Sequence, residues 1–597
     1  MSSDQTNKTE QGIGATFFRT SAENFKKIAS YPIAYWLSDE AFSAFETDSF
    51  LRDVATTRVG MATGDNERFV RQWHEVSRHK IGFGMDREQA ENSSKKWFPY
   101  ANGGEARKWY ANYCHIVNWE NDGSILQTDL HESGRVRAHN FNLDKIFKPG
   151  LTWSLINSTY NAIRVLPPGF LFSSGAPSLF SENKNELPVI CGYYNSAVTS
   201  YFLSAINPTI NNNSGDADKL PYRFNSHQKS IASQGVTAAV DIARIDWDFC
   251  EISWDFTNLP LLHSNHRQPT LKASYQKLRI HWREMTLEMQ RLEEKNNRIF
   301  IDAYGLQDEL TPEVPLNEIT LTCNPHYRYG GDKTEDELEA LLLADTMREL
   351  VSYAVGCMLG RYSLDKPGLI LANQGETLAD YLAQVPQPSF VPDEDNVIPM
   401  LDGDWFADDI TLRFRQFLRV AFGEAHYEDN LAFIEQALNI KNKRNYSLRD
   451  YFLGEFYADH KRRYKKRPIY WLFSSGNGKN GGSFNALVYM HRYRPDTVSV
   501  VLKYLRDYRE KLTTERQRQL AASINPATSQ GDKTRAIKEA ERLAKVLTEL
   551  DDYERDTLYP LATEQLQIDL DDGVKVNYLK FGAALKKIVG LDAKGED

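Results

Sequence analysis

Residues 464–493 read YKKRPIYWLFSSGNGKNGGSFNALVYMHRY, with an apolar run on either side of a glycine-rich stretch. Residues 469–473 are apolar and aromatic enough to form a strand, and residues 484–490 suit a second strand or a helix. The stretch SSGNGKNGGS between them contains Lys479. Glycines and a lysine in this position allow two interpretations: a loop that cradles a phosphate, or a turn between two strands.

The spacing of the glycines decides between these interpretations. A phosphate-binding loop places its first glycine five residues before the glycine of a Gly-Lys pair, and a serine or threonine follows the lysine. Phe473 stands where that first glycine belongs, and Asn480 follows Lys479. The segment therefore predicts a turn between strands rather than a nucleotide pocket.

Composition limits the class of protein. The 597 residues are enough for about three or four domains, and an apolar content of 41% supplies cores for them. No apolar stretch is long enough to span a membrane, and the polar N-terminus contains no export signal. The net charge of −10 gives no global signature of nucleic-acid binding, so any DNA contact must be a local basic surface.

The cysteines indicate a reducing compartment. They are far apart and form no C-x-x-C pair, which argues against a zinc ribbon or a disulfide framework. Together with the missing export signal, this predicts a cytoplasmic protein. The five residues are Cys114, Cys191, Cys250, Cys323 and Cys357.

The composition and the hydrophobic pattern of the sequence change along the chain and suggest five parts. We expect a mixed α/β class in which a loop-rich region precedes helical and α+β modules, and short strands at 151–154 and 189–194. The predicted parts are a disordered tail and linker (1–59), a loop-rich α/β region (60–265), a helical spacer (266–400), a basic α+β module (401–497) and a helical hairpin (498–597).

Helical periodicity is clearest in the second half of the chain. Apolar residues alternate at spacings of four and three from 271 to 292, which predicts one buried seam of a long helix. These positions are Leu271, Tyr275, Leu278, Trp282, Met285, Met289 and Leu292. A second helix is expected at about 333–358, and two amphipathic helices flank the turn INPATSQGD near the C-terminus.

Acidic residues in IDWDFCEISWDF, 245–256, raise the question of a divalent metal. Asp246, Asp248 and Glu251 supply the oxygen ligands that hard cations prefer. Alternation along a strand would put Glu251 on the opposite face, however, and no E-x-K partner follows. We therefore favour a structural or solvated acidic surface, and we assign no metal site. The histidines show no metalloprotease spacing and no G-x-S-x-G elbow occurs.

Asn324-Pro325-His326-Tyr327 approaches the N-P-P-Y tetrapeptide of amino-methyltransferases, in which the Asn side chain and a backbone carbonyl accept from the target amine. His326 replaces the second proline, and the constraint on the backbone is lost. No F-x-G-x-G segment for S-adenosylmethionine accompanies it, and the run 82–84, Gly-Phe-Gly, has no strand of suitable length before it. We assign no catalytic and no cofactor-binding residue to this chain.

Similarity to a known family rests on several segments taken in order. The segments up to residue 256 resemble the region that follows the methyltransferase domain in fused adenine-modifying restriction-modification enzymes, where a G-x-x-T-G-x-N opening leads into the target-recognition domain. These segments are GMATGDNERFVRQWHEV (60–76), KKWFPYANGGEARKWYAN (95–112), 153–180, 195–221 and DWDFCEISWDF (246–256). The later segments resemble the PglX family of BREX phage-defence adenine methyltransferases more specifically. They are CNPHYRYGG (323–331), YAVGCMLGRYSLDKPGLILAN (353–373) and 464–493.

The resemblance covers about 17–580 and implies the C-terminal half of such an enzyme. In the family, the S-adenosylmethionine loop and the N-P-P-Y motif lie upstream, so the cofactor would belong to the intact protein. A truncated piece and a natural split subunit both remain open. The implied partners are double-stranded DNA, other BREX defence proteins and, if the enzyme is split, a separate methyltransferase half.

The resemblance further implies that residues 60–265 read bases, and the basic run HKRRYKKR, 460–467, suggests phosphate contacts. For each basic residue, a solvated surface position is the alternative. We expect the glycine-rich turn to be a mobile, basic-flanked segment along the DNA backbone. The predicted DNA-binding residues are Thr63, Asn66, Arg68, Arg107, Lys108, Arg135, Arg137, Lys461, Arg462, Arg463, Lys465, Lys466, Arg467 and Lys479.

Two other functions stay open at this point. One is a protein-interaction scaffold of a phage-defence complex. The other is a complete methyltransferase whose motifs depart from the known patterns.

Overall fold

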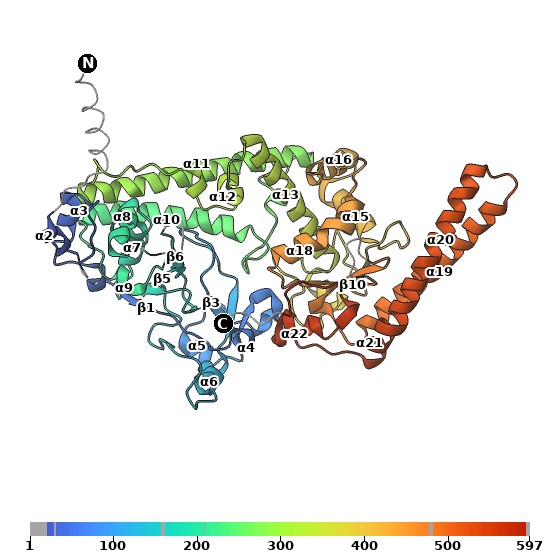
Figure 1. The fold of residues 1–597 in the computed structure, drawn as a ribbon, viewed down its shortest axis with the longest axis horizontal. Helices are drawn as coiled ribbons and strands as arrows, with labels where there is room; N and C mark the ends of the chain where they lie inside the picture. Colours follow the sequence, from blue (N-terminus) through green and yellow to red (C-terminus); the bar gives the residue numbers. More distant parts are fainter. Residues whose placement is uncertain are drawn as a thin grey trace, which may run out of the picture.

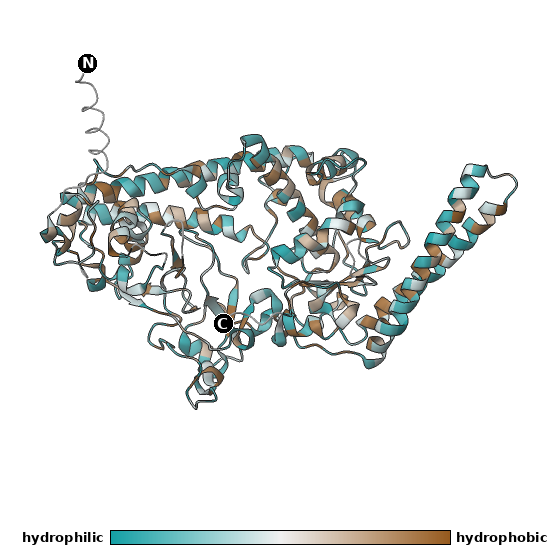
Figure 2. Ribbon diagram, in the orientation of Figure 1, coloured by the Kyte–Doolittle hydropathy of each residue, from teal (hydrophilic) through white to brown (hydrophobic). Residues whose placement is uncertain are grey.

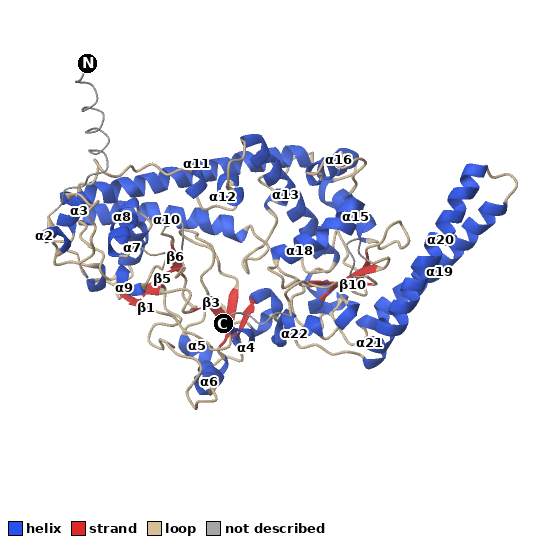
Figure 3. Cartoon of the chain, in the orientation of Figure 1, coloured by secondary structure: helices blue, strands red, loops and turns tan. Residues whose placement is uncertain are grey.

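The computed structural model describes residues 21–28, 31–156, 161–207, 209, 211–476 and 482–592. Two lobes lie beneath one long helix, α11 (Leu271–Tyr304), and a helical hairpin projects from the second lobe (Figure 1). We call residues 31–265 the N-terminal lobe and residues 316–592 the C-terminal lobe. Helices predominate over short strands (Figure 3), which confirms the expected mixed α/β class. Within the predicted tail and linker (1–59), residues 1–20, 29 and 30 lie outside the described residues.

Two four-stranded sheets form the centre of the N-terminal lobe. The first has the order β1–β8–β5–β6 and is antiparallel throughout; the second has the order β2–β4–β3–β7, with a parallel β3–β7 pair. The bounds of the first are Thr56–Arg58, Ser178–Phe180, Gly150–Trp153 and Ile163–Leu166. Those of the second are Val70–Gln72, His115–Asn118, Trp97–Ala101 and Leu171–Phe172. The first sheet extends across the predicted boundary at residue 60.

Helix α7 (Glu186–Tyr194) packs on the first sheet, and α8 (Ala197–Ile206) and α10 (Ser226–Asp248) pack against α7. The strand expected at 151–154 is present as β5, but the one expected at 189–194 is wrong, because these residues belong to α7. Six consecutive residues of α7, from Val189 to Tyr194, are buried. A short run that is apolar on every side carries no periodicity that separates a buried helix from a buried strand.

Helix α11 confirms the expected seam. All seven residues of the seam are buried, and they face α10 and the C-terminal lobe. Thr270 caps the helix by accepting from the backbone N–H of Ala273, and Gly305 ends it with a φ of 71°. With 34 residues, α11 is about 51 Å long, so it spans the tops of both lobes (Figure 1).

A three-stranded antiparallel sheet forms the centre of the C-terminal lobe. Its order is β10–β11–β9, with bounds Tyr470–Ser474, Asn485–Tyr489 and Val397–Pro399. Because Tyr470 pairs with Tyr489 and Ser474 with Asn485, the glycine-rich stretch joins two antiparallel strands, as its spacing predicts. The main helices around this sheet are α12 (Pro325–Tyr329), α13 (Glu335–Met358), α15 (Ile410–Phe422), α16 (Tyr427–Leu438) and α18 (Tyr457–Arg463).

The projecting hairpin consists of α19 (Thr497–Ile524) and α20 (Gln530–Tyr553). Hydrophobic and hydrophilic residues alternate along both helices (Figure 2), as expected of amphipathic helices that pack on each other. Leu512 and Leu543 are buried, whereas Ile537 is 45% exposed. At its base the hairpin continues into α21 (Tyr559–Glu564) and α22 (Gly573–Leu579). Among the described residues, every helix is too short or too polar to cross a membrane.

A fully buried arginine lies where the lobes meet. One terminal nitrogen of Arg361 donates to the hydroxyl of Tyr489 at 2.8 Å, and its Nε donates to the hydroxyl of Tyr362 at 3.1 Å. The guanidinium also lies 5.4 Å from the ring centre of Trp73, in the N-terminal lobe. Hydroxyl oxygens and aromatic faces therefore stabilise this charge, and in the described part of the chain it forms no ion pair with a carboxylate.

Asp571 fastens the end of the chain to the N-terminal lobe. Its carboxylate accepts from Lys80 at 2.8 Å, from Lys96 at 2.9 Å and from the indole N–H of Trp97 at 3.1 Å. Nearby, the carboxylate of Glu75 accepts from the backbone N–H of Val574 at 2.8 Å. Burial alone would raise the pKa of Asp571, but the hydrogen bonds from the two lysines and the indole outweigh it and lower that pKa.

We predict that Asp571→Asn lowers the free energy of unfolding by about 1–3 kcal/mol, because it removes the charge that neutralises two half-buried lysines. A carboxyl whose pKa falls on folding stabilises the protein above its unfolded pKa, and this contribution disappears as pH falls through the folded value. The difference in melting temperature between wild type and variant should therefore shrink below about pH 4.

Asp572→Asn is the matched control, because the Asp572 side chain is 46% exposed and its ion pair, with Lys580 at 3.3 Å, lies at the surface. We expect almost no change in melting temperature for this variant. Equal losses of stability in both variants would show that Asp571 does not fasten the lobes.

Candidate nucleic-acid interface

Five of the predicted DNA-binding residues gather at one end of the N-terminal lobe. The loop 60–68 packs against the segment 129–139, which follows α6 (Glu120–Thr128) at the lower end of Figure 1. Ala62 and His139 exchange two backbone hydrogen bonds, at 3.1 and 3.0 Å. Gly64 has a φ of 71°, and a side chain there would collide with Arg137. We call this group the distal cluster: Thr63, Asn66, Arg68, Arg135 and Arg137.

The residues of the distal cluster differ in what they offer to a ligand. Thr63 is buried, and its hydroxyl donates to the side-chain oxygen of Asn66 at 2.8 Å, so it shapes the loop. Arg68 and Arg137 flank the carboxylate of Asp129, at 2.8 and 3.4 Å, and both remain partly exposed. Arg135 is exposed as well. Arg68 and Arg137 thus share one carboxylate while each keeps an exposed part of its side chain, and the same two segments also contain Asp65, Glu67 and Glu132.

Lys108 lies in the interior, which corrects its assignment to a DNA surface. Its ammonium donates to Glu293 of α11 at 2.6 Å, and the indole N–H of Trp109 donates to the other oxygen of the same carboxylate at 2.8 Å. The Lys108 side chain is only 6% exposed. The residue therefore joins the N-terminal lobe to α11, and no surface of it faces a phosphate.

The basic run 461–467 does not form one surface either, because its residues point in different directions. Arg463 donates to Glu251 at 3.1 Å, and Arg467 lies 3.9 Å from Glu75, so both face the N-terminal lobe. Lys461 packs over the ring of Tyr457, and its pKa is lowered by burial and by the nearby Lys586. Exposed cations remain at Arg462, Lys465 and Lys466, the last two with left-handed backbone.

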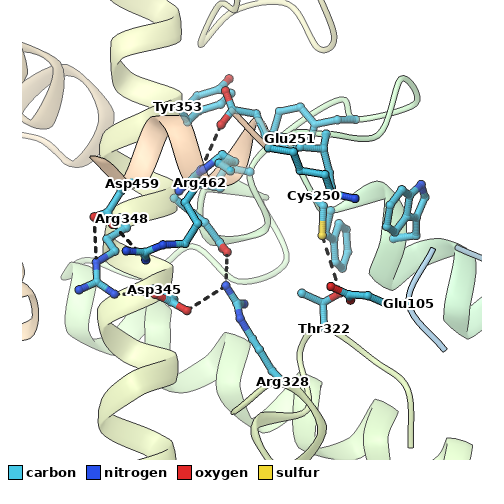
Figure 4. Close-up of a pocket in the computed structure, with 18 of the residues that line it drawn as sticks. Glu105, Cys250, Glu251, Thr322, Arg328, Asp345, Arg348, Tyr353, Asp459 and Arg462 are labelled. Atoms are coloured by element: carbon cyan, nitrogen blue, oxygen red, sulfur yellow. Dashed lines mark hydrogen bonds and ion pairs between the residues drawn. The ribbon is translucent and has the colours of Figure 1, made fainter. Parts of the chain in front are cut away.

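A cavity of about 290 Å³ lies between the two lobes and brings Arg107 together with Arg462, Arg463 and Lys465. Figure 4 shows its ion pairs: Arg328 bridges Asp345 and Glu349 at 3.1 and 3.0 Å. Arg348 bridges Asp345 and Asp459 at 2.7 and 3.2 Å. We call this cavity between the two lobes the central cavity. The sequence singled out four of its cations but none of these carboxylates, because their spacing along the chain carries no signal.

The acidic residues of 245–256 are used by the fold, and the alternation of a strand does not apply to them. Asp246, at the end of α10, accepts from the backbone N–H groups of Thr322 and Cys323 at 2.6 and 2.9 Å. Asp248 accepts from the hydroxyl of Ser253, and burial raises its pKa to about 6. Among the described residues, no group of three or more potential ligands is arranged for a metal ion.

The stem of the glycine-rich turn is occupied by a carboxylate. Glu549 of α20 accepts from the backbone N–H of Ser483 at 2.8 Å, from the Ser483 hydroxyl at 2.7 Å and from the Ser475 hydroxyl. An anion such as phosphate would meet this negative charge at the donors it needs. The tip itself, 477–481 with Lys479, lies outside the described residues, and the predicted contact of Lys479 stays a prediction.

Asn324 of the Asn-Pro-His-Tyr tetrapeptide caps α12. It is fully buried and its amide donates to the carbonyls of Leu316 and Ile319 at 2.7 and 2.8 Å, while its oxygen accepts from the N–H of His326 at 3.2 Å. The hydroxyl of Tyr327 donates to the carbonyl of Ala106 at 3.0 Å. Each polar group of the side chain that could recognise an amine is therefore already paired.

Known proteins resemble the chain along nearly its whole length. It is 38% identical over 595 residues to "Adenine-specific methyltransferase BrxX" of Escherichia coli O9:H4 (strain HS), and 35% identical over 584 residues to "Adenine-specific methyltransferase PglX" of Lacticaseibacillus casei (strain Zhang). Each match covers 96% of this chain and 46% of the relative. No protein-family model matches the sequence.

The chain is similar in sequence to the BrxX and PglX methyltransferases. It spans about half the length of these relatives. Similarity to adenine-specific enzymes makes the tetrapeptide at 324–327 important, because its sequence resembles a catalytic motif and its geometry is that of a helix cap.

We predict that Asn324→Ala lowers the free energy of unfolding by about 2–4 kcal/mol, because two buried carbonyls lose their donor and α12 loses its cap. Asn324→Asp keeps the capping oxygen but turns a second oxygen toward the same carbonyls, so it should be at least as destabilising. Thermal unfolding of the two variants measures both effects.

A methyl-transfer assay gives the result that would contradict a purely structural role of Asn324. If the purified chain moved label from S-adenosylmethionine to DNA, and Asn324→Ala abolished this without lowering the melting temperature, the tetrapeptide would be a catalytic motif.

Proposed function

We propose that this chain is the DNA-recognition portion, in the C-terminal half, of a BREX-type adenine-specific DNA methyltransferase used in phage defence. Its support is the similarity to BrxX and PglX over about half of their length. The other half would bind S-adenosylmethionine and transfer the methyl group. Its natural setting would be the cytoplasm, with other BREX proteins as partners and with the catalytic half either fused or separate.

The distal cluster is the observation that carries this proposal. Residues about 70 positions apart in sequence, Arg68 and Arg137, lie around one carboxylate on an exposed end of the lobe. Arginine is suited to this position, because its fork of donors can pair with phosphate oxygens or with the edge of guanine in the major groove. Asn66 beside them offers an amide, the group that pairs with adenine.

The exposed part of the basic run suits a different task. Arg462, Lys465 and Lys466 are exposed and lie on the C-terminal lobe. Phosphate contacts of this type position a protein on DNA without selecting a sequence. The proposal therefore separates base reading in the N-terminal lobe from backbone contacts in the C-terminal lobe.

S-adenosylmethionine does not fit the one glycine run considered for it. A side chain at Gly82 would collide with the ring of Phe98, and Gly84 lies against Gly169. Gly82 therefore permits close packing beneath β3, and we derive no step of the reaction through a cofactor in this chain.

A protein-interaction scaffold is the second candidate, and the hairpin favours it. Beyond its base, α19 and α20 contact mainly each other, and Leu520 and Ile524 near the tip are 42% and 80% exposed. Stable complexes with other defence proteins, together with an absence of salt-dependent DNA binding, would support this function over DNA recognition.

Salt dependence tests the backbone contacts. We predict that replacing Arg462, Lys465 and Lys466 by alanine reduces the slope of log affinity against log salt by about two to three units on duplex DNA, since each lost phosphate contact removes about 0.9. Binding to target and non-target duplexes should weaken equally. Fluorescence anisotropy at several salt concentrations measures the slope.

The matched control removes three exposed cations from the hairpin, Arg518, Arg535 and Lys538. We expect its slope to equal that of wild type. If the first variant kept the wild-type slope while remaining folded, the basic run would be a solvated surface.

Exchange of segments tests base reading. We predict that exchanging residues 56–265 between two relatives with different targets, in the intact methyltransferase, transfers the methylated sequence. The exchange starts at residue 56 so that β1 stays with its sheet. Sequencing of the modified adenines provides the measurement, and a change of target upon exchange of 401–497 instead would place recognition in the C-terminal lobe.

A further inference from the structure

The central cavity is lined by a carboxylate, Glu251, with one buried oxygen that accepts no hydrogen bond from the described residues. Glu251 follows α10 and lines the cavity, and its side chain is only 5% exposed. The hydroxyl of Ser352 and the guanidinium of Arg463 both donate to the same oxygen, Oε2, at 2.7 and 3.1 Å. The other oxygen, Oε1, is buried and has no hydrogen-bond partner in the described part of the chain. An unused acceptor in such a place calls for a donor from outside the fold.

The walls and the rim of the cavity indicate what carries that donor. Phe249, Phe256 and Tyr353 are among the residues that line the cavity, and Phe249 is the one of these three rings that is only half-buried; an aromatic surface of this kind stacks on bases. Arg462 and Lys465, both exposed, stand at its edge and carry positive charge. Figure 4 shows Glu251 and Tyr353 together on one side of the cavity, with Arg462 below them.

The charges in the cavity argue against a simple anion site. Arg328 and Arg348 are each held by two carboxylates, so they cannot turn toward an added anion without breaking those pairs. Of the described cations that line the cavity, Lys465 and Arg462 are the exposed ones, and Arg462 pairs with Asp459 at 3.3 Å; the exposed carboxylate of Glu105 also lines the cavity. A ligand must therefore have an N–H donor at one end and negative charge at the other.

We propose that the central cavity binds a single nucleotide whose base stacks on the aromatic wall and donates an exocyclic amino group to Glu251, with its phosphate beside Lys465 and Arg462. A volume of about 290 Å³ is at the lower end of the range for small-molecule sites and suits one nucleotide. The nucleotide can be free or extruded from DNA, since the recognised groups are the same. The proposal shares Arg462 and Lys465 with the proposed backbone contacts, but Glu251 takes no part in those contacts, so the tests of Glu251 separate the two.

Calorimetric titration of the full chain tests it with two probes, AMP and purine riboside 5′-monophosphate, which lacks the amino group. Wild type should bind AMP about tenfold or more tightly than the second probe, because a hydrogen bond to a buried carboxylate distinguishes them. In Glu251→Gln the amide keeps its oxygen toward Arg463 and presents N–H to the ligand, so this preference should disappear. Loss of a preference separates recognition from a mere loss of folding.

Adjacent lysines provide the matched control. Lys465→Ala should weaken the binding of AMP but leave that of adenosine unchanged. Lys466 is exposed but does not line the cavity, so Lys466→Ala should change neither.

A duplex with one unpaired adenosine, compared with the fully paired duplex, distinguishes a free nucleotide from one extruded from DNA. A preference for the unpaired adenosine that Glu251→Gln removes indicates an extruded nucleotide; binding of AMP without such a preference indicates a free one.

Two results would overturn the proposal. One is an absence of binding of both AMP at millimolar concentration and the unpaired adenosine. The other is equal affinity of wild type for AMP and for the analogue without the amino group.

Discussion

The arrangement of the two lobes depends on the burial of Arg361. A guanidinium that is permanently charged and completely enclosed is costly unless its surroundings replace water. Here the replacement comes from three separate parts of the chain: Trp73 of the N-terminal lobe, Tyr362 after α13 and Tyr489 of β11. None of these parts can solvate the charge alone. The arginine is thus stable only when both lobes are assembled, and this favours one relative orientation over others.

Patterns that repeat along one element were predictable from the sequence. The seam of α11 and the β10–β11 pair follow from local periodicity and from a glycine spacing, and the structure contains both. The strand predicted at 189–194 was wrong, because a run of residues that is buried on all sides has no hydrophobic period that separates a helix from a strand. Asn324 shows a different limit. Its side chain was compared with a catalytic motif, yet capping a short helix uses the same residue type for a purely local reason.

Charge density along the chain was a poorer guide than periodicity. The run 461–467 looks like a single basic surface, but a helix end and a left-handed turn direct its side chains to different places, and Arg463 and Arg467 find carboxylates in the other lobe. The partners of these cations, Glu251 and Glu75, are separated from them by some 200 to 400 residues, so no local spacing could reveal them. Conversely, the residues of the distal cluster come from two segments that were predicted separately from the sequence, and the fold brings these segments together.

The fastening of Asp571 to Lys96 joins residues that are 475 positions apart, and this has a consequence during synthesis. At the usual pace of translation, 5–20 residues per second, roughly 25 to 95 seconds pass between the appearance of the two residues. For that interval the side of the N-terminal lobe around Trp97 is open to solvent or to chaperones, and the lobe must persist on its own two sheets. A segment synthesised long after the N-terminal lobe is therefore the one that covers this side of it.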